Sequence, residues 1–418
     1  MRTRIEHSGA AKLACILCLF LFSCNPWIGG AVAQPGSSWQ VGTPIATYWA
    51  GPAITDAVAQ QMVEGGFNLV WCGSEAELDV AHRHGLRGQL TSGLFTPASL
   101  DDPDRRQQLD ALIARVSKHP ALYSYHLIDE PSAAQFPALG KLVAYMRQRD
   151  PQHLAYINLF PTYANNQQLG TKGDTVTAYA EHLRLYVEQV KPSLISYDHY
   201  QFQLKGDGDQ YFLNLAMIRR TAQEAGVPFL NIVQACTWAP DAMRIPNADE
   251  LRYLVYSTVA YGAQGISYYV YAHPNHHGSL VGLDGTPGPL YHAVKSYNRE
   301  FVAIAKELQP LRSLGVYHTS MRERGCEPLP PDAAFRIESS ASPASPRGFL
   351  LGLFGAGESP THAVVVNLDY TAGASATLVG PGALERFDAG TAQWTSANKS
   401  AIELTLPPGG GALVRTAR

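Results

Sequence analysis

Residues 121–131, with the sequence ALYSYHLIDEP, are the stretch that decides the fold. The first eight of them are aromatic and apolar, which is typical of a strand that is buried on both faces. Asp129 and Glu130 follow where this strand stops, and Pro131 ends it and begins a helix. The stretch therefore predicts a strand of a parallel sheet with two adjacent carboxylates at its C-terminal end.

The same pattern continues in both directions from this strand. Seven other short apolar runs occur between residues 43 and 312, and each is followed by a stretch of helical period. Ser74 with Glu77, and Asn247 with Glu250, have the spacing of a capping box and predict two helix starts. The eight predicted strands cover residues 43–49, 67–72, 86–92, 121–128, 153–160, 194–200, 227–235 and 265–271.

Eight strand–helix units predict a closed (β/α)8 barrel, an α/β fold in which all strands are parallel. An open doubly wound sheet is disfavoured because no Gly-x-Gly-x-x-Gly follows any strand, so a dinucleotide would lack its phosphate turn. No lysine lies at a predicted strand end, which disfavours a Schiff base. We expect no cofactor.

A second region follows the barrel. Residues 321–348 are rich in Pro, Ser and Ala, and short strand-like runs separated by Gly and Pro turns come after them. These runs predict a small C-terminal antiparallel β-sandwich. The expected organisation is a signal peptide at 1–33, a barrel at 40–320 and a sandwich at 335–418.

The N-terminus has the features of an export signal. Positive charges, the apolar run Leu13–Phe22 and the small residues before Gln34 follow one another in the order of a signal peptide. The apolar run is too short to span a bilayer, and no later segment has the character of a transmembrane span. The segment ending at Cys24 also resembles a bacterial lipobox. We expect an exported protein, periplasmic or extracellular, with lipid attachment at Cys24 as an open alternative.

Composition excludes some classes of partner. Lys and Arg number 32 against 35 Asp and Glu, so the net charge of −3 offers no electrostatic case for nucleic acid or an anionic membrane. Three of the six cysteines fall in the signal region, and the other three have no CxxC spacing, which argues against a disulfide framework. The oligomeric state is not determined by any pattern in the sequence.

In a (β/α)8 barrel, the residues at the C-terminal ends of the strands share one cavity. Here they are polar and aromatic, and aromatic faces stack on sugar rings while amides, imidazoles and carboxylates bind hydroxyls. The three histidines at positions 273, 276 and 277 lie on a Pro- and Gly-bounded loop and are not predicted to bind metal. The predicted sugar-binding residues are Trp49, Asp129, Asn158, His199, Tyr200, Gln234, Trp238, Tyr271 and His273.

Residues 43–312 resemble the barrel of clan A glycoside hydrolases, broadly the family that includes the bacterial β-galactosidases of family 42. In that family, the general acid/base is a Glu preceded by Asn at the end of strand four. The resemblance implies that Glu130 is the general acid, with Asp129 where Asn is usual. It also implies a nucleophilic Glu at the end of strand seven, and this sequence has Gln234 there. A neutral amide cannot form a glycosyl-enzyme ester.

Three interpretations of this departure stay open. Asp198 can act as the base of an inverting pair with Glu130, at a separation of about 6.5–9.5 Å against about 5–5.5 Å for a retaining pair. Alternatively, another carboxylate such as Glu75 or Asp241 fills the role. Finally, the barrel can bind sugar without cleaving it. The leading interpretation is an O-glycosidase of an oligo- or polysaccharide with Glu130 and Asp198 as catalytic residues, and the alternative is a non-catalytic carbohydrate-binding protein.

Overall fold

The computed structural model describes residues 44–340 and 347–417. The predicted signal peptide, the lipobox at Cys24 and the first residues of the expected barrel range lie outside the described residues. Within the described ranges, none of the helices combines the length and the apolar character that crossing a bilayer requires.

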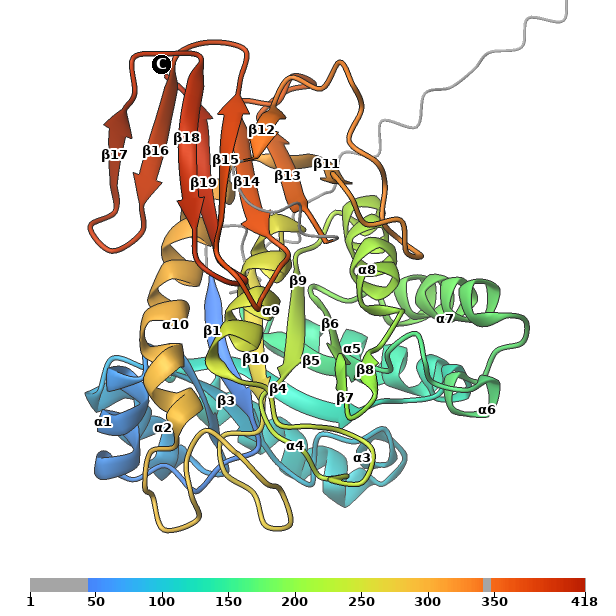
Figure 1. Ribbon diagram of the computed structural model, residues 1–418. Helices are drawn as coiled ribbons and strands as arrows, with labels where there is room; N and C mark the ends of the chain where they lie inside the picture. Colours follow the sequence, from blue (N-terminus) through green and yellow to red (C-terminus); the bar gives the residue numbers. More distant parts are fainter. Residues whose placement is uncertain (1–43, 341–346, 418) are drawn as a thin grey trace, which may run out of the picture. The chain divides into compact units, whose positions relative to one another are not determined.

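The structure confirms the predicted (β/α)8 barrel. Eight strands form one parallel sheet in the order β1-β10-β9-β6-β5-β4-β3-β2, with helices packed around it (Figure 1). The strands are β1 Ile45–Trp49, β2 Leu69–Cys72, β3 Arg87–Thr91, β4 Leu122–Asp129, β5 Leu154–Leu159, β6 Ile195–His199, β9 Phe229–Gln234 and β10 Gly265–Tyr269.

The helices follow the strands as the periodicity predicts. At the starts of α2 and α9, the side chains of Ser74 and Asn247 accept hydrogen bonds from the backbone N–H groups of Glu77 and Glu250, as the capping signatures indicate. The helices are α1 Asp56–Glu64, α2 Glu75–Arg83, α3 Ala98–Asp101, α4 Pro103–Val116, α5 Phe136–Arg149, α6 Asn166–Leu169, α7 Thr175–Val190, α8 Tyr211–Ala225, α9 Ala248–Ala260 and α10 Pro289–Leu308, with a 3₁₀ turn at Ala133–Gln135 before α5.

Side chains bridge β1 and β2, the two ends of the strand order. The Asn68 amide oxygen accepts a hydrogen bond from the Ala46 N–H at 3.0 Å, and its amide nitrogen donates to the Pro44 carbonyl at 2.9 Å. The Thr47 hydroxyl donates to the Leu69 carbonyl at 2.8 Å. These contacts satisfy backbone groups that a regular ladder would otherwise pair, so the sheet is nearly closed into a barrel.

The barrel interior is a packed core rather than a pore. Its apolar side chains form a cluster that is separate from the larger core between strands and helices, because alternate residues of each strand point to opposite faces. The interior cluster consists of Ile45, Leu69, Tyr123, Leu154, Tyr156, Leu194, Leu230 and Ile232. It forms a solid floor beneath the residues at the C-terminal strand ends.

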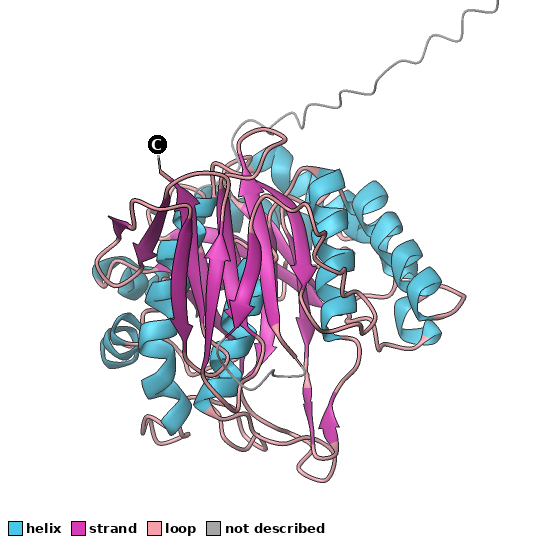
Figure 2. Cartoon of the chain, turned by 45° about the horizontal axis from the view of Figure 1, so that its top comes forward, coloured by secondary structure: helices cyan, strands magenta, loops and turns pink. Residues whose placement is uncertain are grey.

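The predicted C-terminal β-sandwich is also confirmed. The C-terminal region contains a six-stranded antiparallel sheet, β11-β13-β14-β19-β16-β17, and a three-stranded antiparallel sheet, β12-β15-β18 (Figure 2). Strand β11 lies inside the residue range expected for the barrel, yet it pairs with β13 of this sheet. The strands are β11 Arg312–His318, β12 Arg336–Ser340, β13 Phe349–Gly355, β14 His362–Asn367, β15 Ala374–Val379, β16 Leu384–Asp388, β17 Gln393–Ser396, β18 Ala401–Leu406 and β19 Gly411–Thr416.

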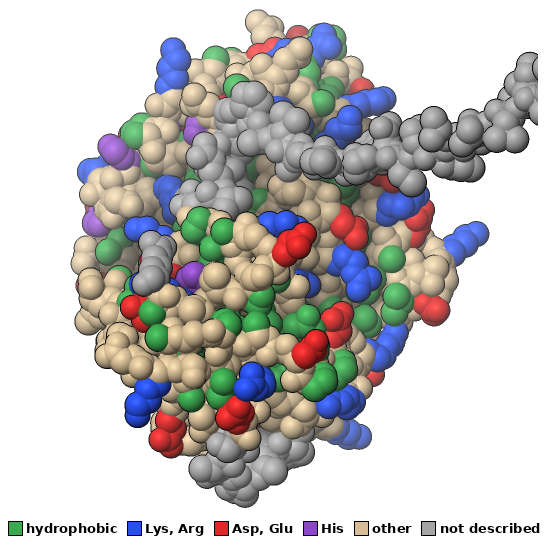
Figure 3. All heavy atoms as spheres, turned by 90° about the horizontal axis from the view of Figure 1, so that it is seen from above, with side chains coloured by type: hydrophobic (Ala, Val, Ile, Leu, Met, Phe, Trp, Pro, Cys, Tyr) green, Lys and Arg blue, Asp and Glu red, His purple; other side chains and the backbone are tan. Residues whose placement is uncertain are grey.

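The sandwich packs directly on the barrel through β13 and α9. Gly352 of β13 lies so close to α9 that a Cβ atom there would be 2.0 Å from the Ala260 carbonyl oxygen. This backbone-to-backbone approach explains why the position is a glycine. On the face seen in Figure 3, basic and acidic side chains are interspersed, as the small net charge suggests.

We predict that Gly352→Ala lowers the free energy of unfolding by about 1–3 kcal/mol, because the added methyl group must push β13 away from α9. Equilibrium urea denaturation measures this change. Gly357→Ala is the matched control: Gly357 is exposed and a Cβ there meets no atom within 4 Å. Equal free energies of unfolding for the two variants would show that the contact is not tight.

Candidate active site

A β-bulge in β4 aims Asp129 into the barrel. His126 pairs with Tyr156 of β5, whereas Ile128 pairs with the very next residue of β5, Ile157, so Leu127 is one residue too many for the ladder. Beyond the bulge, Asp129 pairs with Asn158 and shares its inward direction. In a regular strand the alternation from His126 would turn Asp129 toward the helices, so the bulge re-aims this carboxylate.

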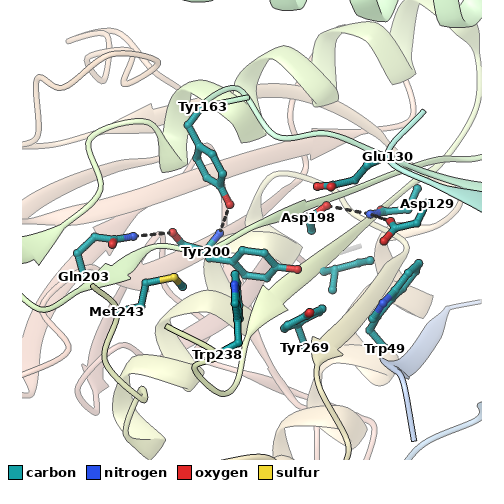
Figure 4. Close-up of a pocket in the computed structure, with 12 residues that line it drawn as sticks. Trp49, Asp129, Glu130, Tyr163, Asp198, Tyr200, Gln203, Trp238, Met243 and Tyr269 are labelled. Atoms are coloured by element: carbon teal, nitrogen blue, oxygen red, sulfur yellow. Dashed lines mark hydrogen bonds between the residues drawn. The ribbon is translucent and has the colours of Figure 1, made fainter. Parts of the chain in front are cut away.

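Glu130 comes next and has an uncommon backbone conformation. Its φ is 45°, in the left-handed region, and its N–H donates to the Asn158 carbonyl at 2.9 Å. A non-glycine residue in this region is uncommon and costs conformational energy, and such strain clusters at functional sites. As a result Glu130 lies over the cavity, with its carboxyl beside that of Asp198 (Figure 4).

Asn158 holds two carboxylates together from β5. Its amide nitrogen donates to Asp129 at 3.1 Å and to Asp198 of β6 at 2.8 Å. The Ser196 hydroxyl donates to the Asn158 amide oxygen at 3.0 Å and is itself 2.7 Å from the Tyr156 hydroxyl. Because Ser196 occupies the amide oxygen, the amide nitrogen must face the carboxylates.

The carboxyl groups of Glu130 and Asp198 lie beside each other at the cavity and interact directly (Figure 4). Two ionised carboxylates this close would repel, which favours a proton shared by the pair. Burial, followed by the negative charges of Asp198 and Asp129, raises the pKa of Glu130. Burial and the charge of Asp129 also raise the pKa of Asp198, which is only 3% exposed, while the hydrogen bond from Asn158 opposes this rise.

These carboxyls face a cavity of about 370 Å³ at the C-terminal strand ends. Its other wall is aromatic: the Tyr200 ring lies 4.7 Å from Trp238 and 5.0 Å from Tyr269, and Trp238 is 38% exposed. The aromatic and apolar lining can stack on a sugar ring, and the carboxyls and amides can bind hydroxyls. The lining residues are Trp49, Asp129, Glu130, Asn158, Tyr163, Asp198, Tyr200, Gln203, Ile232, Trp238, Met243 and Tyr269.

Seven of the eleven residues predicted from the sequence meet in this cavity. They are Trp49, Asp129, Glu130, Asn158, Asp198, Tyr200 and Trp238. The two alternative carboxylates lie elsewhere: Glu75 forms an ion pair with Arg115 at the surface, and Asp241 is exposed outside the lining.

Gln234 does not face the cavity, and its prediction as a sugar-binding residue is corrected by its contacts. It is fully buried, and its amide oxygen accepts from the Phe202 N–H at 2.7 Å. Its amide nitrogen donates to the carbonyls of Phe202 and Arg244 at 3.2 and 2.9 Å. All these partners are backbone groups of loops that cover the end of β9, so this amide has a structural role.

Three further predicted sugar-binding residues also point away from the cavity. His199 is buried, with its ring Nδ1 2.9 Å from the Asn214 amide oxygen. Burial lowers the pKa of its imidazole to about 4. β10 ends at Tyr269, two residues before the predicted end, so Tyr271 lies beyond the strand. Its hydroxyl donates to the Gln61 side chain at 2.6 Å. His273 is exposed and contacts His276 on its own loop.

Five lining residues were not predicted from the sequence. Tyr269 is the last residue of β10 and would have been found with the correct strand end. Ile232 lies inside the predicted seventh strand, where the alternation of β9 turns it inward. Tyr163, Gln203 and Met243 come from loops after β5, β6 and β9, and no periodicity marks loop residues as inward-facing.

The spacing expected for an inverting pair is not present. The carboxyls of Glu130 and Asp198 interact directly, and Asp129 and Asp198 share one donor nitrogen, so neither of these two pairs leaves the room that an attacking water needs at about 6.5–9.5 Å. Among the described residues, no group of three or more His, Cys, Asp or Glu side chains has the arrangement of a metal site.

Comparisons with solved structures identify the fold. A glycoside hydrolase of family 5 from Bacteroides vulgatus ATCC 8482 is 8% identical, with 88% of this chain and 87% of that chain covered and a TM-score of 0.52. A second structure, described as a glycoside hydrolase, is 12% identical over 88% of this chain and 90% of that chain, with a TM-score of 0.50. Both matches extend past the barrel into the C-terminal sheets.

A β-galactosidase from the psychrophilic Marinomonas ef1 is 12% identical over 63% of this chain, with a TM-score of 0.45, and the chain spans only 60% of its length. No protein-family profile matches this sequence, and no curated protein matches it. The likeness is therefore one of fold, a (β/α)8 barrel followed by β-sheets, and it does not single out family 42.

We predict that Glu130→Gln raises the melting temperature by about 3 °C at pH 9 and by less at pH 5. A carboxyl with a raised pKa in the folded state stabilises the protein below its ordinary pKa of about 4.3 and loses this contribution as pH rises through the raised pKa. Thermal melts from pH 5 to 9 measure the difference, with the exposed Glu358→Gln as control. A difference that does not grow with pH would contradict the shared proton.

Proposed function

We propose that this chain is an exported glycoside hydrolase that cleaves O-glycosidic bonds of an oligo- or polysaccharide, with Glu130 as general acid. The observation that carries the proposal is the pair of adjacent carboxyl groups, Glu130 and Asp198, in a cavity walled by aromatic rings. A carboxyl whose pKa is raised stays protonated near neutral pH and can donate its proton to a leaving oxygen. The fold shared with glycoside hydrolases is consistent with this chemistry.

Each carboxyl has a distinct role in the proposal. Glu130 transfers its proton to the glycosidic oxygen as the bond to the anomeric carbon breaks. Asp198, buried and held by Asn158, is then ionised and stabilises the positive charge that develops on the sugar. After the leaving group departs, a water molecule adds to the anomeric carbon and gives its proton to the Glu130 carboxylate, which restores the acid. The rings of Tyr200 and Trp238 hold the sugar by stacking.

The resemblance to family 42 supports only part of this assignment. The position of Glu130 at the end of the fourth barrel strand agrees with that family's acid/base residue. The buried amide of Gln234 does not supply a nucleophile from the seventh strand, β9. We therefore propose membership of clan A, with a second carboxylate drawn from β6 instead.

A non-catalytic carbohydrate-binding protein is the second candidate. It is favoured by the same observation on β9, because none of the described cavity-lining carboxyls comes from that side of the barrel. All three acids lie on β4 and β6, while the opposite wall is aromatic. Such a cavity can bind a sugar even if the bond is never cleaved.

The charge of the cavity restricts the substrate. Three carboxyls line it, and the described lining residues include no Lys, Arg or His. A carboxylate or sulfate on the sugar would meet like charge in a poorly solvated space, which is unfavourable. We therefore propose that the substrate unit in the cavity is a neutral or amino sugar.

We predict that Glu130→Gln and Asp198→Asn each lower kcat/KM on a cleaved oligosaccharide by about 10²–10⁴-fold, because proton transfer and charge stabilisation are lost. Product release from a panel of plant and bacterial oligosaccharides identifies the substrate and measures the change. Glu358→Gln, on the surface, should match the wild type.

Two outcomes would contradict the assignment in different ways. Unchanged activity in Glu130→Gln would reject Glu130 as the acid. No cleavage of any sugar by the wild type, with binding detected by calorimetry, would replace the hydrolase with the carbohydrate-binding protein.

We predict that a neutral galactoside or glucoside is preferred at least about tenfold over the matched uronide, whose carboxylate faces Asp129 and Asp198. Asp129→Asn should narrow this ratio, because it removes one negative charge while keeping the hydrogen-bonding shape. Competition binding of the matched pair measures the ratio without requiring cleavage. Equal binding of both sugars to the wild type would contradict the proposed charge selection.

A further inference from the structure

One wall of the cavity is built by two loops rather than by barrel strands. Tyr200 and Gln203 come from the segment after β6, which contains a hairpin formed by β7 Phe202–Gln203 and β8 Gly206–Asp207. Trp238 and Met243 come from the loop after β9. Strands of two residues are marginal on their own, so this wall depends on contacts made outside the hairpin.

The two loops are joined to each other. The Leu204 N–H donates to the Ala242 carbonyl at 3.0 Å, and the Arg244 N–H donates to the Phe202 carbonyl at 3.4 Å. From beneath, the amide of Gln234 bonds to backbone groups of both Phe202 and Arg244. The hairpin and the loop after β9 therefore form one unit.

The C-terminal region holds this unit from behind through Asp207. One oxygen of the Asp207 carboxylate accepts from Arg347 at 2.7 Å and from the Tyr370 hydroxyl at 2.7 Å. Its other oxygen accepts from Arg244 at 3.3 Å. Arg347 lies just before β13 and Tyr370 just after β14, so both belong to the sandwich side of the chain.

The contact is largely shielded from water, which makes it effective. The Asp207 side chain is only 12% exposed, so salt screens its charge weakly. The buried Phe202 ring packs under it, with the Arg244 guanidinium 4.5 Å from its centre and the Tyr370 ring edge-on at 5.8 Å. Charged hydrogen bonds and packing thus act on the same hairpin.

We propose that Asp207 is a positioning residue, and that Arg347 and Tyr370 of the C-terminal region set the placement of Tyr200, Gln203 and Trp238 in the cavity wall. The sandwich would then be part of the substrate site, although no sandwich residue lines the cavity among those described. The proposal rests on the proposed function only in assuming that this wall contacts the sugar.

Fluorine NMR of the full chain labelled with 5-fluorotryptophan tests the placement without any substrate. Trp238 packs on Tyr200 at 4.7 Å and reports the wall, and Trp238→Phe assigns its resonance. We expect Asp207→Asn and Arg347→Met to shift or broaden the Trp238 resonance and to leave that of Trp71 unchanged. Tyr370→Phe removes only the hydroxyl that donates to Asp207 and should give a smaller shift of the Trp238 resonance. This variant tests the proposal if the other two fail to fold.

Arg252→Ala is the matched control. Arg252 donates to the Pro408 carbonyl at 2.7 Å and so also joins a barrel helix to the sandwich side, but its hydrogen bonds go to Asp249 and Pro408 and, among the residues that the structure describes, none goes to the hairpin. It should leave the Trp238 resonance in place. An equal shift in Arg252→Ala, or no shift in Asp207→Asn, would overturn the proposal.

Kinetics supply a second readout on the cleaved oligosaccharide. Asp207→Asn should raise KM about tenfold and change kcat by less than about twofold, because the wall binds the sugar while Glu130 and Asp198 stay in place. A fall in kcat with unchanged KM would overturn the proposal. If the wild type cleaves nothing, the same tenfold change is expected in the sugar's dissociation constant, so failure of the hydrolase assignment and failure of the Asp207 assignment remain distinguishable.

Discussion

The double hydrogen bond from Asn158 to Asp129 and Asp198 is the interaction on which the site depends. It brings two acids from the strands on either side of β5 to one nitrogen, and Ser196 fixes the direction of that amide. Like charges so close together in a buried place raise each other's affinity for protons, and Glu130 completes the cluster by sharing one. Burial and like charge thus raise the pKa values of these carboxyls, while the hydrogen bonds from Asn158 hold two of them in place and partly oppose the rise.

Barrel geometry explains why these groups meet at all. Parallel strands present their C-terminal ends on one side, so residues that are far apart in the chain become neighbours over a floor of packed apolar side chains. The bulge at Leu127 and the left-handed backbone of Glu130 then turn two consecutive residues into the same cavity. In a regular strand, consecutive side chains would point to opposite faces.

The C-terminal sandwich is joined to the barrel in two different ways. At α9 the contact is close and non-polar, with Gly352 against the Ala260 backbone. At the hairpin it is polar and charged, through Asp207. The contact at α9 contributes to the stability of the fold. The contact at Asp207 joins the sandwich to the loops that form one wall of the cavity. The fold similarity to two solved glycoside hydrolases covers 88% of this chain and therefore includes both the barrel and the sandwich.

The sequence by itself determined the eight parallel strands, the capped helices, the sandwich and seven of the cavity residues, because hydrophobic period and capping are local properties of the chain. It could not determine the direction of Asp129, which depends on a bulge in register with β5, or the burial of Gln234, which depends on loops that fold over β9. Tyr271 was misplaced because pairing of β10 stops at Tyr269. His199 was misplaced because it follows Asp198 within the paired part of β6, where consecutive side chains point to opposite faces. Only the tertiary structure decided which carboxyls touch, because a shared proton requires atoms brought within hydrogen-bonding distance by three separate strands and their partners.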